Sequence, residues 1–74
     1  MSEVKVTSDC FGFVYKVEVE KGQVVAKDDT LIIMEAMKME IPLASPCAGV
    51  VKEILVREGD SLKEEQVILV LENA

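Results

Sequence analysis

Two stretches of the chain share one order of apolar and polar positions. When the sequence is shifted by 37 positions, residues 10–36 align with residues 47–73 without a gap. Glycines that recur at matching places predict matching turns, because glycine adopts backbone conformations that other residues resist. The sequence therefore predicts an internal repeat of one structural unit. The identical pairs include Cys10 with Cys47, Gly12 with Gly49, and Gly22 with Gly59.

Short apolar runs separated by polar turns indicate strands throughout the chain. Val and Ile supply much of the apolar content, and both favour strands. In the first long run, Phe13, Tyr15, Val17 and Val19 alternate with Val14 and with polar residues, which predicts a half-buried strand with these four on its apolar face. The expected strands are a first one around Val4 and Val6, then residues 12–19, 24–25, 31–36, 39–44, 49–56, 61–62 and 67–72. The pattern predicts an all-β protein.

The stretch MEAMKME, residues 34–40, is helical by propensity alone. Its first residues, Met34 and Glu35, align with Leu71 and Glu72 at the end of VILVLE, a predicted strand. Pro42 would end a helix after a marginal length. We therefore expect a hairpin with Met37 and Lys38 as its two central residues. Such turns prefer Asn-Gly or Gly-X, because their central residues often need a positive φ. Residues that suit a turn poorly indicate a function, here the display of Lys38.

The neighbours of Lys38 sharpen this interpretation. Met37 and Met39 flank it and are expected to be exposed, whereas Met34 is expected to fill the core. Glu35 and Glu40 should face each other across the hairpin, where like charges are unfavourable. These features favour recognition of the turn by a partner.

Composition excludes several classes of function. The 74 residues carry a net charge of −6 and no His, which argues against nucleic-acid binding. No apolar run reaches the roughly 20 residues that span a bilayer, and the start MSEVKV does not resemble a signal peptide, so we expect a cytoplasmic protein that does not bind membranes. Cys10 and Cys47 are expected to be reduced thiols, and no metal site is expected. Without His, none of the serines has a base to activate it, so no catalytic residue is predicted.

The segment EAMKM, Glu35 to Met39, resembles the biotin-attachment motif of biotin carboxyl carrier domains. The pattern GxVxxxxVxxG occurs in both halves, and ASPCAGVVKEILVREGD resembles the segment that follows the hairpin in this family, so the resemblance covers nearly the whole chain as one biotinyl (biotin/lipoyl attachment) domain, residues 1–74. It implies a flattened β-barrel, or barrel-sandwich hybrid, of two four-stranded antiparallel sheets related by a pseudo-two-fold axis. It also implies biotin attached covalently to Lys38, with the flanking motif residues Glu35, Ala36, Met37 and Met39.

The resemblance implies a non-catalytic carrier of a biotin-dependent carboxylase of the acyl-CoA carboxylase type. Its partners would be a biotin protein ligase, a biotin carboxylase and a carboxyltransferase, and the isolated chain would be a monomer. The alternative is a small stand-alone biotin/lipoyl attachment protein or a lipoyl carrier, although lipoyl domains usually have Asp-Lys-Ala where this chain has Met37, Lys38 and Met39. One departure is SDCFGFV, where many members have Pro near the first glycine.

Overall fold

The computed structural model describes residues 2–73, which form eight strands. The strands are β1 (Ser2–Thr7), β2 (Gly12–Val17), β3 (Val24–Val25), β4 (Thr30–Ala36), β5 (Met39–Ala44), β6 (Gly49–Ile54), β7 (Ser61–Leu62) and β8 (Val67–Asn73). These residues contain no helix, and hence none that is long and apolar enough to cross a membrane. The all-β prediction is confirmed.

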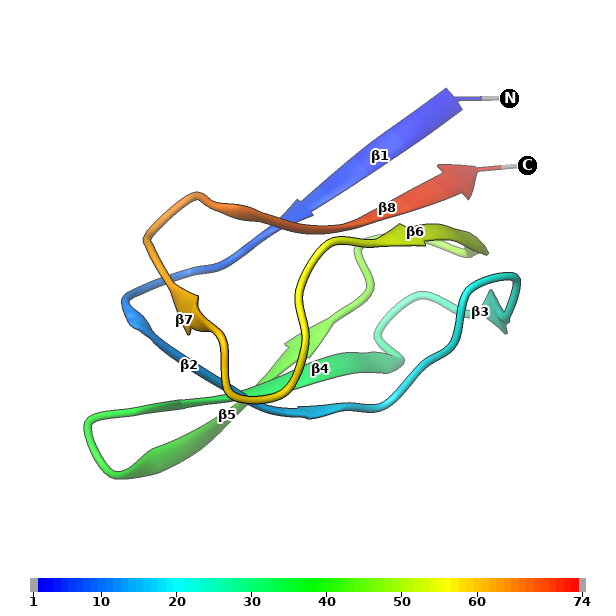
Figure 1. Ribbon diagram of the computed structural model, residues 1–74. Helices are drawn as coiled ribbons and strands as arrows, with labels where there is room; N and C mark the ends of the chain where they lie inside the picture. Colours follow the sequence, from blue (N-terminus) through cyan, green and yellow to red (C-terminus); the bar gives the residue numbers. More distant parts are fainter. Residues whose placement is uncertain (1, 74) are drawn as a thin grey trace.

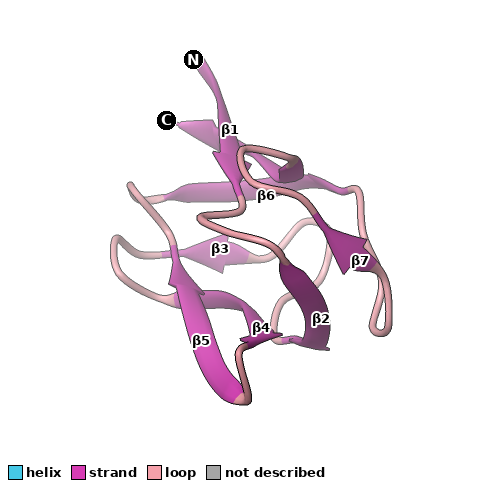
Figure 2. Cartoon of the chain, turned by 90° about the vertical axis from the view of Figure 1, so that its left-hand side faces the viewer, coloured by secondary structure: helices cyan, strands magenta, loops and turns pink. Residues whose placement is uncertain are grey.

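The strands form two antiparallel sheets of four strands each, in the orders β1-β8-β6-β3 and β5-β4-β2-β7 (Figures 1 and 2). The short strand β3 from the first half of the repeat pairs with β6 from the second half, and β7 pairs with β2 in the same way. The two halves are therefore interlocked. The sheets face each other as a flattened barrel-sandwich without closing into one continuous barrel.

Backbone hydrogen bonds between the halves follow the same pseudo-two-fold relation. The turn glycine of each half donates to a strand of the other half, Gly22 N to Val51 O at 2.7 Å and Gly59 N to Val14 O at 2.8 Å. The two donors, Gly22 and Gly59, are 37 positions apart, and so are the two acceptors, Val14 and Val51. Both glycines have a positive φ, 90° and 92°, which explains their identity in the two halves. The repeat is thus a repeat of structure.

The core between the sheets is aliphatic. Its fully buried members include Leu31, Ile32 and Met34 from β4 and Ile68, Leu69 and Leu71 from β8. Burial of such side chains supplies most of the favourable free energy of folding. The prediction that Met34 belongs to the core is confirmed.

The predicted apolar face of β2 is partly wrong. Phe13 and Tyr15 are 57% and 51% exposed, and the buried residue of this stretch is Val14. A bulge between Val14 and Lys16 interrupts the regular pairing with β4, so the strict alternation on which the prediction rests is broken there. Beyond the bulge the pattern resumes, and Val19 is buried although it lies past the end of the strand.

The molecule is elongated, with extents of 36 × 17 × 17 Å. The β4–β5 hairpin projects at one end, and the outer ends of β1 and β8 lie at the opposite end (Figure 1). The tip of the hairpin is thus separated from the outer ends of β1 and β8 by the length of the molecule.

Candidate functional site

The two residues at the tip of the β4–β5 hairpin adopt an unfavourable backbone conformation. Ala36 pairs with Met39, which leaves Met37 and Lys38 as the central residues of a two-residue turn. Their φ angles are 50° and 62°, in the left-handed region that costs about 1–2 kcal/mol for an ordinary residue. Regular pairing of β4 with β5 from Ile32 and Leu43 up to Ala36 and Met39 holds the turn in place. The predicted hairpin is confirmed, as is its conflict with local preference.

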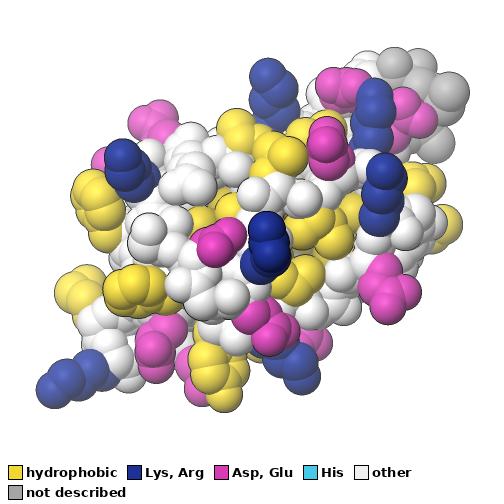
Figure 3. Space-filling model, viewed as in Figure 1, with side chains coloured by type: hydrophobic (Ala, Val, Ile, Leu, Met, Phe, Trp, Pro, Cys, Tyr) yellow, Lys and Arg dark blue, Asp and Glu magenta, His cyan; other side chains and the backbone are white. Residues whose placement is uncertain are grey.

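Lys38 presents its amine to solvent. The flanking methionines are 91% and 64% exposed at Met37 and Met39, as expected from the sequence. Within residues 2–73 the ion pairs are Lys16 with Glu18 and Lys52 with Glu3, so Lys38 is not neutralised by a carboxylate there. A primary amine on an exposed, well-held turn suits covalent attachment of an acyl group. Figure 3 shows a basic side chain, in dark blue, projecting at the end of the molecule where the hairpin lies.

Negative charge lies directly behind the tip. Glu35 and Glu40 are paired across the hairpin, as predicted, and both are exposed. The equivalent acidic pair at the other end of the repeat, Glu3 and Glu72, has a basic neighbour. There the Lys52 amine donates a hydrogen bond to the Glu3 carboxylate, which holds the pKa of Glu3 below its usual range and raises the pKa of Lys52.

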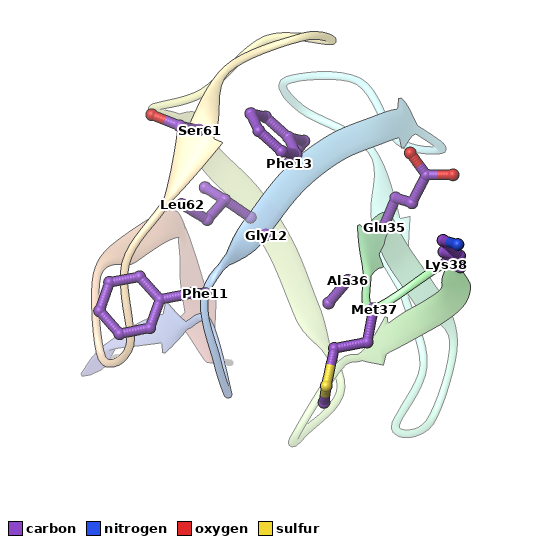
Figure 4. Close-up of a pocket in the computed structure, with 9 residues that line it drawn as sticks. All are labelled: Phe11, Gly12, Phe13, Glu35, Ala36, Met37, Lys38, Ser61 and Leu62. Carbon is purple, nitrogen blue, oxygen red and sulfur yellow. The ribbon is translucent and has the colours of Figure 1, made fainter.

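A groove with a volume of about 570 Å³ lies beside the hairpin. One side is lined by Phe11 from the loop before β2, Phe13 from β2 and Leu62 from β7. The other side is lined by Ala36, Met37 and Lys38 from the hairpin (Figure 4). Phe11, Phe13 and Leu62 were not predicted as site residues. The repeat held a signal for the two phenylalanines, because their counterparts are the smaller Ala48 and Val50.

Gly12 lets β2 lie close to the hairpin at this groove. A Cβ atom built on Gly12 would lie 2.4 Å from the Glu35 carbonyl oxygen and 2.7 Å from the Met34 Cε. No side chain fits at these distances without a shift of the backbone. The close approach pairs Phe13 with Glu35 of the hairpin, and Phe11 and Met37 lie on two sides of the groove (Figure 4).

Other candidate groups have structural roles. Ser8 and Ser45 are buried, and their hydroxyls donate to the carbonyls of Cys10 and Cys47 at 2.8 and 2.6 Å. Cys10 and Cys47 are both free and partly buried against the core. In the part of the chain that the structure describes, no group of three or more His, Cys, Asp or Glu side chains is placed to hold a metal ion.

Residues 3–71 match the sequence model of a family described as "Biotin-requiring enzyme", the biotin/lipoyl attachment domain. Among solved structures, the urea carboxylase of Kluyveromyces lactis matches with a TM-score of 0.92 and 28% identity, over 97% of this chain and 6% of that protein. A single-chain, multi-domain long-chain acyl-CoA carboxylase matches with the same score and identity, over 97% of this chain and 7% of that one. The chain thus corresponds to a small part of each. No curated protein sequence gave a significant match.

Proposed function

Because the chain belongs to the biotin/lipoyl attachment family, we propose that it is a carrier that holds biotin on Lys38 and moves a carboxyl group between two active sites of a biotin-dependent carboxylase. Membership of the family establishes that the chain is a biotin/lipoyl attachment domain. The attachment residue, the partners and the absence of intrinsic catalysis belong to the proposal.

The observation that supports this proposal most strongly is the display of Lys38. Met37 and Lys38 both occupy the left-handed region without being Gly or Asn, at the end of the molecule opposite the outer ends of β1 and β8. A turn of this kind is unfavourable for folding, and such strain is found where function requires it. The amine is thereby held away from the body of the domain, where another protein can reach it.

Attachment of biotin requires a neutral amine at this position. A lysine amine in water is protonated near neutral pH, so the ligase must supply the conditions that remove a proton. The Lys38 nitrogen then attacks the carboxyl carbon of biotinyl adenylate. An amide bond forms, the bond from that carbon to the phosphate oxygen of the adenylate breaks, AMP leaves and the amine proton passes to the ligase or to solvent. The sequence has no His that could act as this base.

The carrier itself needs no catalytic group. Biotin, when bound, supplies a site that accepts a carboxyl group from a biotin carboxylase and releases it at a carboxyltransferase. The chain contributes a rigid β body and a flexible lysine stem, which together keep the attached group at a high local concentration near both active sites. Two similar solved structures are carboxylases, a urea carboxylase and a single-chain, multi-domain long-chain acyl-CoA carboxylase, and this supports partners that carry out carboxylation. We expect the isolated chain to be a monomer.

The test is biotinylation of the wild-type chain and a Lys38→Arg variant by a biotin protein ligase with ATP. Arginine keeps the charge and much of the stem, but its guanidinium stays protonated and cannot form the amide. Intact mass and streptavidin blotting should show one biotin on the wild type and none on Lys38→Arg. Lys63→Arg, a substitution in a polar turn, is the matched control and should still take one biotin. Stoichiometric biotin on Lys38→Arg would overturn the assignment of Lys38 as the attachment residue. The intact mass of the chain purified from its native cell shows whether the attached group is biotin or lipoyl.

A further inference from the structure

The groove beside the hairpin exposes large apolar side chains to water. Phe11 is 70% exposed and Phe13 is 57% exposed, and the exposed Met37 lines the same groove. The buried side chains of Ala36 and Leu62 line its inner part. Figure 3 shows hydrophobic side chains, in yellow, at this end of the molecule as well as along the middle of the same face. A cluster of large exposed apolar groups around a hollow indicates a surface that binds something.

The repeat shows that the fold does not need these aromatic side chains. At the opposite end the same backbone arrangement recurs, since a Cβ atom on Gly49 would lie 2.5 Å from the Glu72 carbonyl oxygen, as one on Gly12 would lie 2.4 Å from that of Glu35. There the counterparts of Phe11 and Phe13 are Ala48 and Val50. The aromatic pair is therefore a property of the end that carries Lys38.

On the premise that biotin is attached to Lys38, we propose that this groove binds the fused-ring head of the biotin tethered to the same molecule. The volume of about 570 Å³ lies within the roughly 300–1,000 Å³ range of small-molecule sites. Apolar ring atoms gain from contact with Phe11 and Phe13. Glu35 also lines the groove and is exposed, and its carboxylate offers an acceptor for ureido N–H groups.

The tether makes a weak site effective. Lys38 lines the groove, although its amine lies on the side of the hairpin away from Phe11, so the head reaches the groove by rotation about the flexible lysine side chain (Figure 4). A short flexible link gives an effective concentration in the millimolar range. A groove with millimolar intrinsic affinity would therefore hold about half of the tethered heads at any time. The docked state protects the head between encounters, and the undocked state is the one that partners capture.

The test compares the wild type with the double variant Phe11→Ala/Phe13→Val, which places the residues of the opposite half in the groove. Both positions are exposed, so the variant should fold. Each protein is labelled with ¹³C and ¹⁵N, biotinylated by the ligase with unlabelled biotin and checked by intact mass. Isotope-filtered NOEs should connect biotin ring protons with Phe11, Phe13 and Met37 in the wild type and should be lost in the variant. Streptavidin capture should be about twofold faster for the variant, because no fraction of its heads is docked.

Val24→Ala is the matched control, since Val24 is 75% exposed on β3 at the opposite end and is the repeat counterpart of Ser61. It should keep the NOEs and the capture rate of the wild type. A biotinylated wild type without NOEs to the groove, or equal capture rates for wild type and double variant, would overturn the inference. If the double variant instead raises the KM of the ligase and the wild type shows no such NOEs, the groove is a docking surface for proteins and the inference is wrong. A wild type that gains no mass would overturn the proposed function and the inference with it.

Discussion

The two halves of this molecule share one scaffold and differ at their ends. In each half a buried serine hydroxyl donates to a carbonyl two residues ahead, and a turn residue has a positive φ, 74° at Asp28 and 65° at its counterpart Glu65. Against this common background, the first half continues after Ala36 into a tight hairpin with an exposed lysine. Features present in both halves serve the fold, and features present in one half are candidates for function.

The acidic pairs behind the two ends make the same distinction. Glu35 faces Glu40 behind the hairpin, and their counterparts Glu72 and Glu3 face each other at the other end. At the other end Lys52 bonds to Glu3, whereas the counterpart of Lys52 near the hairpin is Tyr15. Like charges facing each other across strands are unfavourable. The hairpin end thus retains a repulsion that the other end relieves, which is consistent with selection for a partner and not for stability.

The shared scaffold predicts equal damage from equivalent changes at its two close contacts. Gly12→Ala and Gly49→Ala each place a methyl group about 2.5 Å from a backbone carbonyl oxygen, on Glu35 and Glu72 respectively. Each should lower the free energy of unfolding by about 3 kcal/mol, measured by guanidinium denaturation. Gly22→Ala, where a Cβ atom would meet nothing within 4 Å and only φ is unfavourable, should cost about 1 kcal/mol. A large difference between the first two variants would break the equivalence of the halves.

The repeat, the bulge in β2 and the contacts between the halves determine which features of the structure the sequence predicts. The order of the strands in residues 10–36 and 47–73 was predictable, because the gapless repeat constrains each segment twice. The exposure of Met37 and Met39 was predictable because the strand ending at Ala36 and the strand starting at Met39 leave a two-residue turn between them. The exposure of Phe13 and Tyr15 was not, because the bulge after Val14 comes from pairing with β4 and leaves no mark in the alternation of side chains. The groove depends on the approach of β7 to β2, a contact between the two halves of the repeat. The assignment of Lys38 as the attachment residue stays a prediction.

Strain at the hairpin can be separated from strain that only the fold requires. Asn tolerates the left-handed region, so Met37→Asn and Glu65→Asn should each raise the free energy of unfolding by about 0.5–1 kcal/mol. Only Met37→Asn should reduce biotin acceptance, measured as kcat/KM for the ligase. Equal acceptance by both variants would show that Met37 is not recognised.

The exposed methionines provide a smaller effect on stability. Met37→Leu and Met39→Leu should each change the free energy of unfolding by less than about 0.5 kcal/mol, because both side chains lie largely in solvent. We expect slower biotinylation or carboxyl transfer by both variants. Thermal unfolding followed by circular dichroism measures the change in stability. Larger destabilisation with unchanged transfer would identify these residues as packing residues.

The smallest effect concerns Lys52, whose repeat counterpart near the hairpin is Tyr15. Lys52→Gln removes the hydrogen bond to Glu3, so its Tm at low ionic strength should fall slightly below that of the wild type. The bond lowers the pKa of Glu3 from 4.5, so the stabilisation is present above about that pH and is lost as the pH falls through the lowered value. The raised pKa of Lys52 means that the stabilisation also persists up to about pH 10.5 and is lost above the raised value.

The difference in Tm between wild type and Lys52→Gln should therefore be greatest near neutral pH, disappear in strong acid, and shrink in 1 M salt because exposed charges are screened. Tyr15→Lys is the reciprocal change, since it gives Glu40 the basic neighbour that Glu3 has. It should raise the Tm slightly, with the same dependence on salt. If Tyr15→Lys leaves the Tm unchanged at low salt while Lys52→Gln lowers it, the repulsion between Glu35 and Glu40 is already relieved by solvent. The contrast between the two acidic pairs would then carry no cost to folding, and the unneutralised pair would not be evidence of selection by a partner.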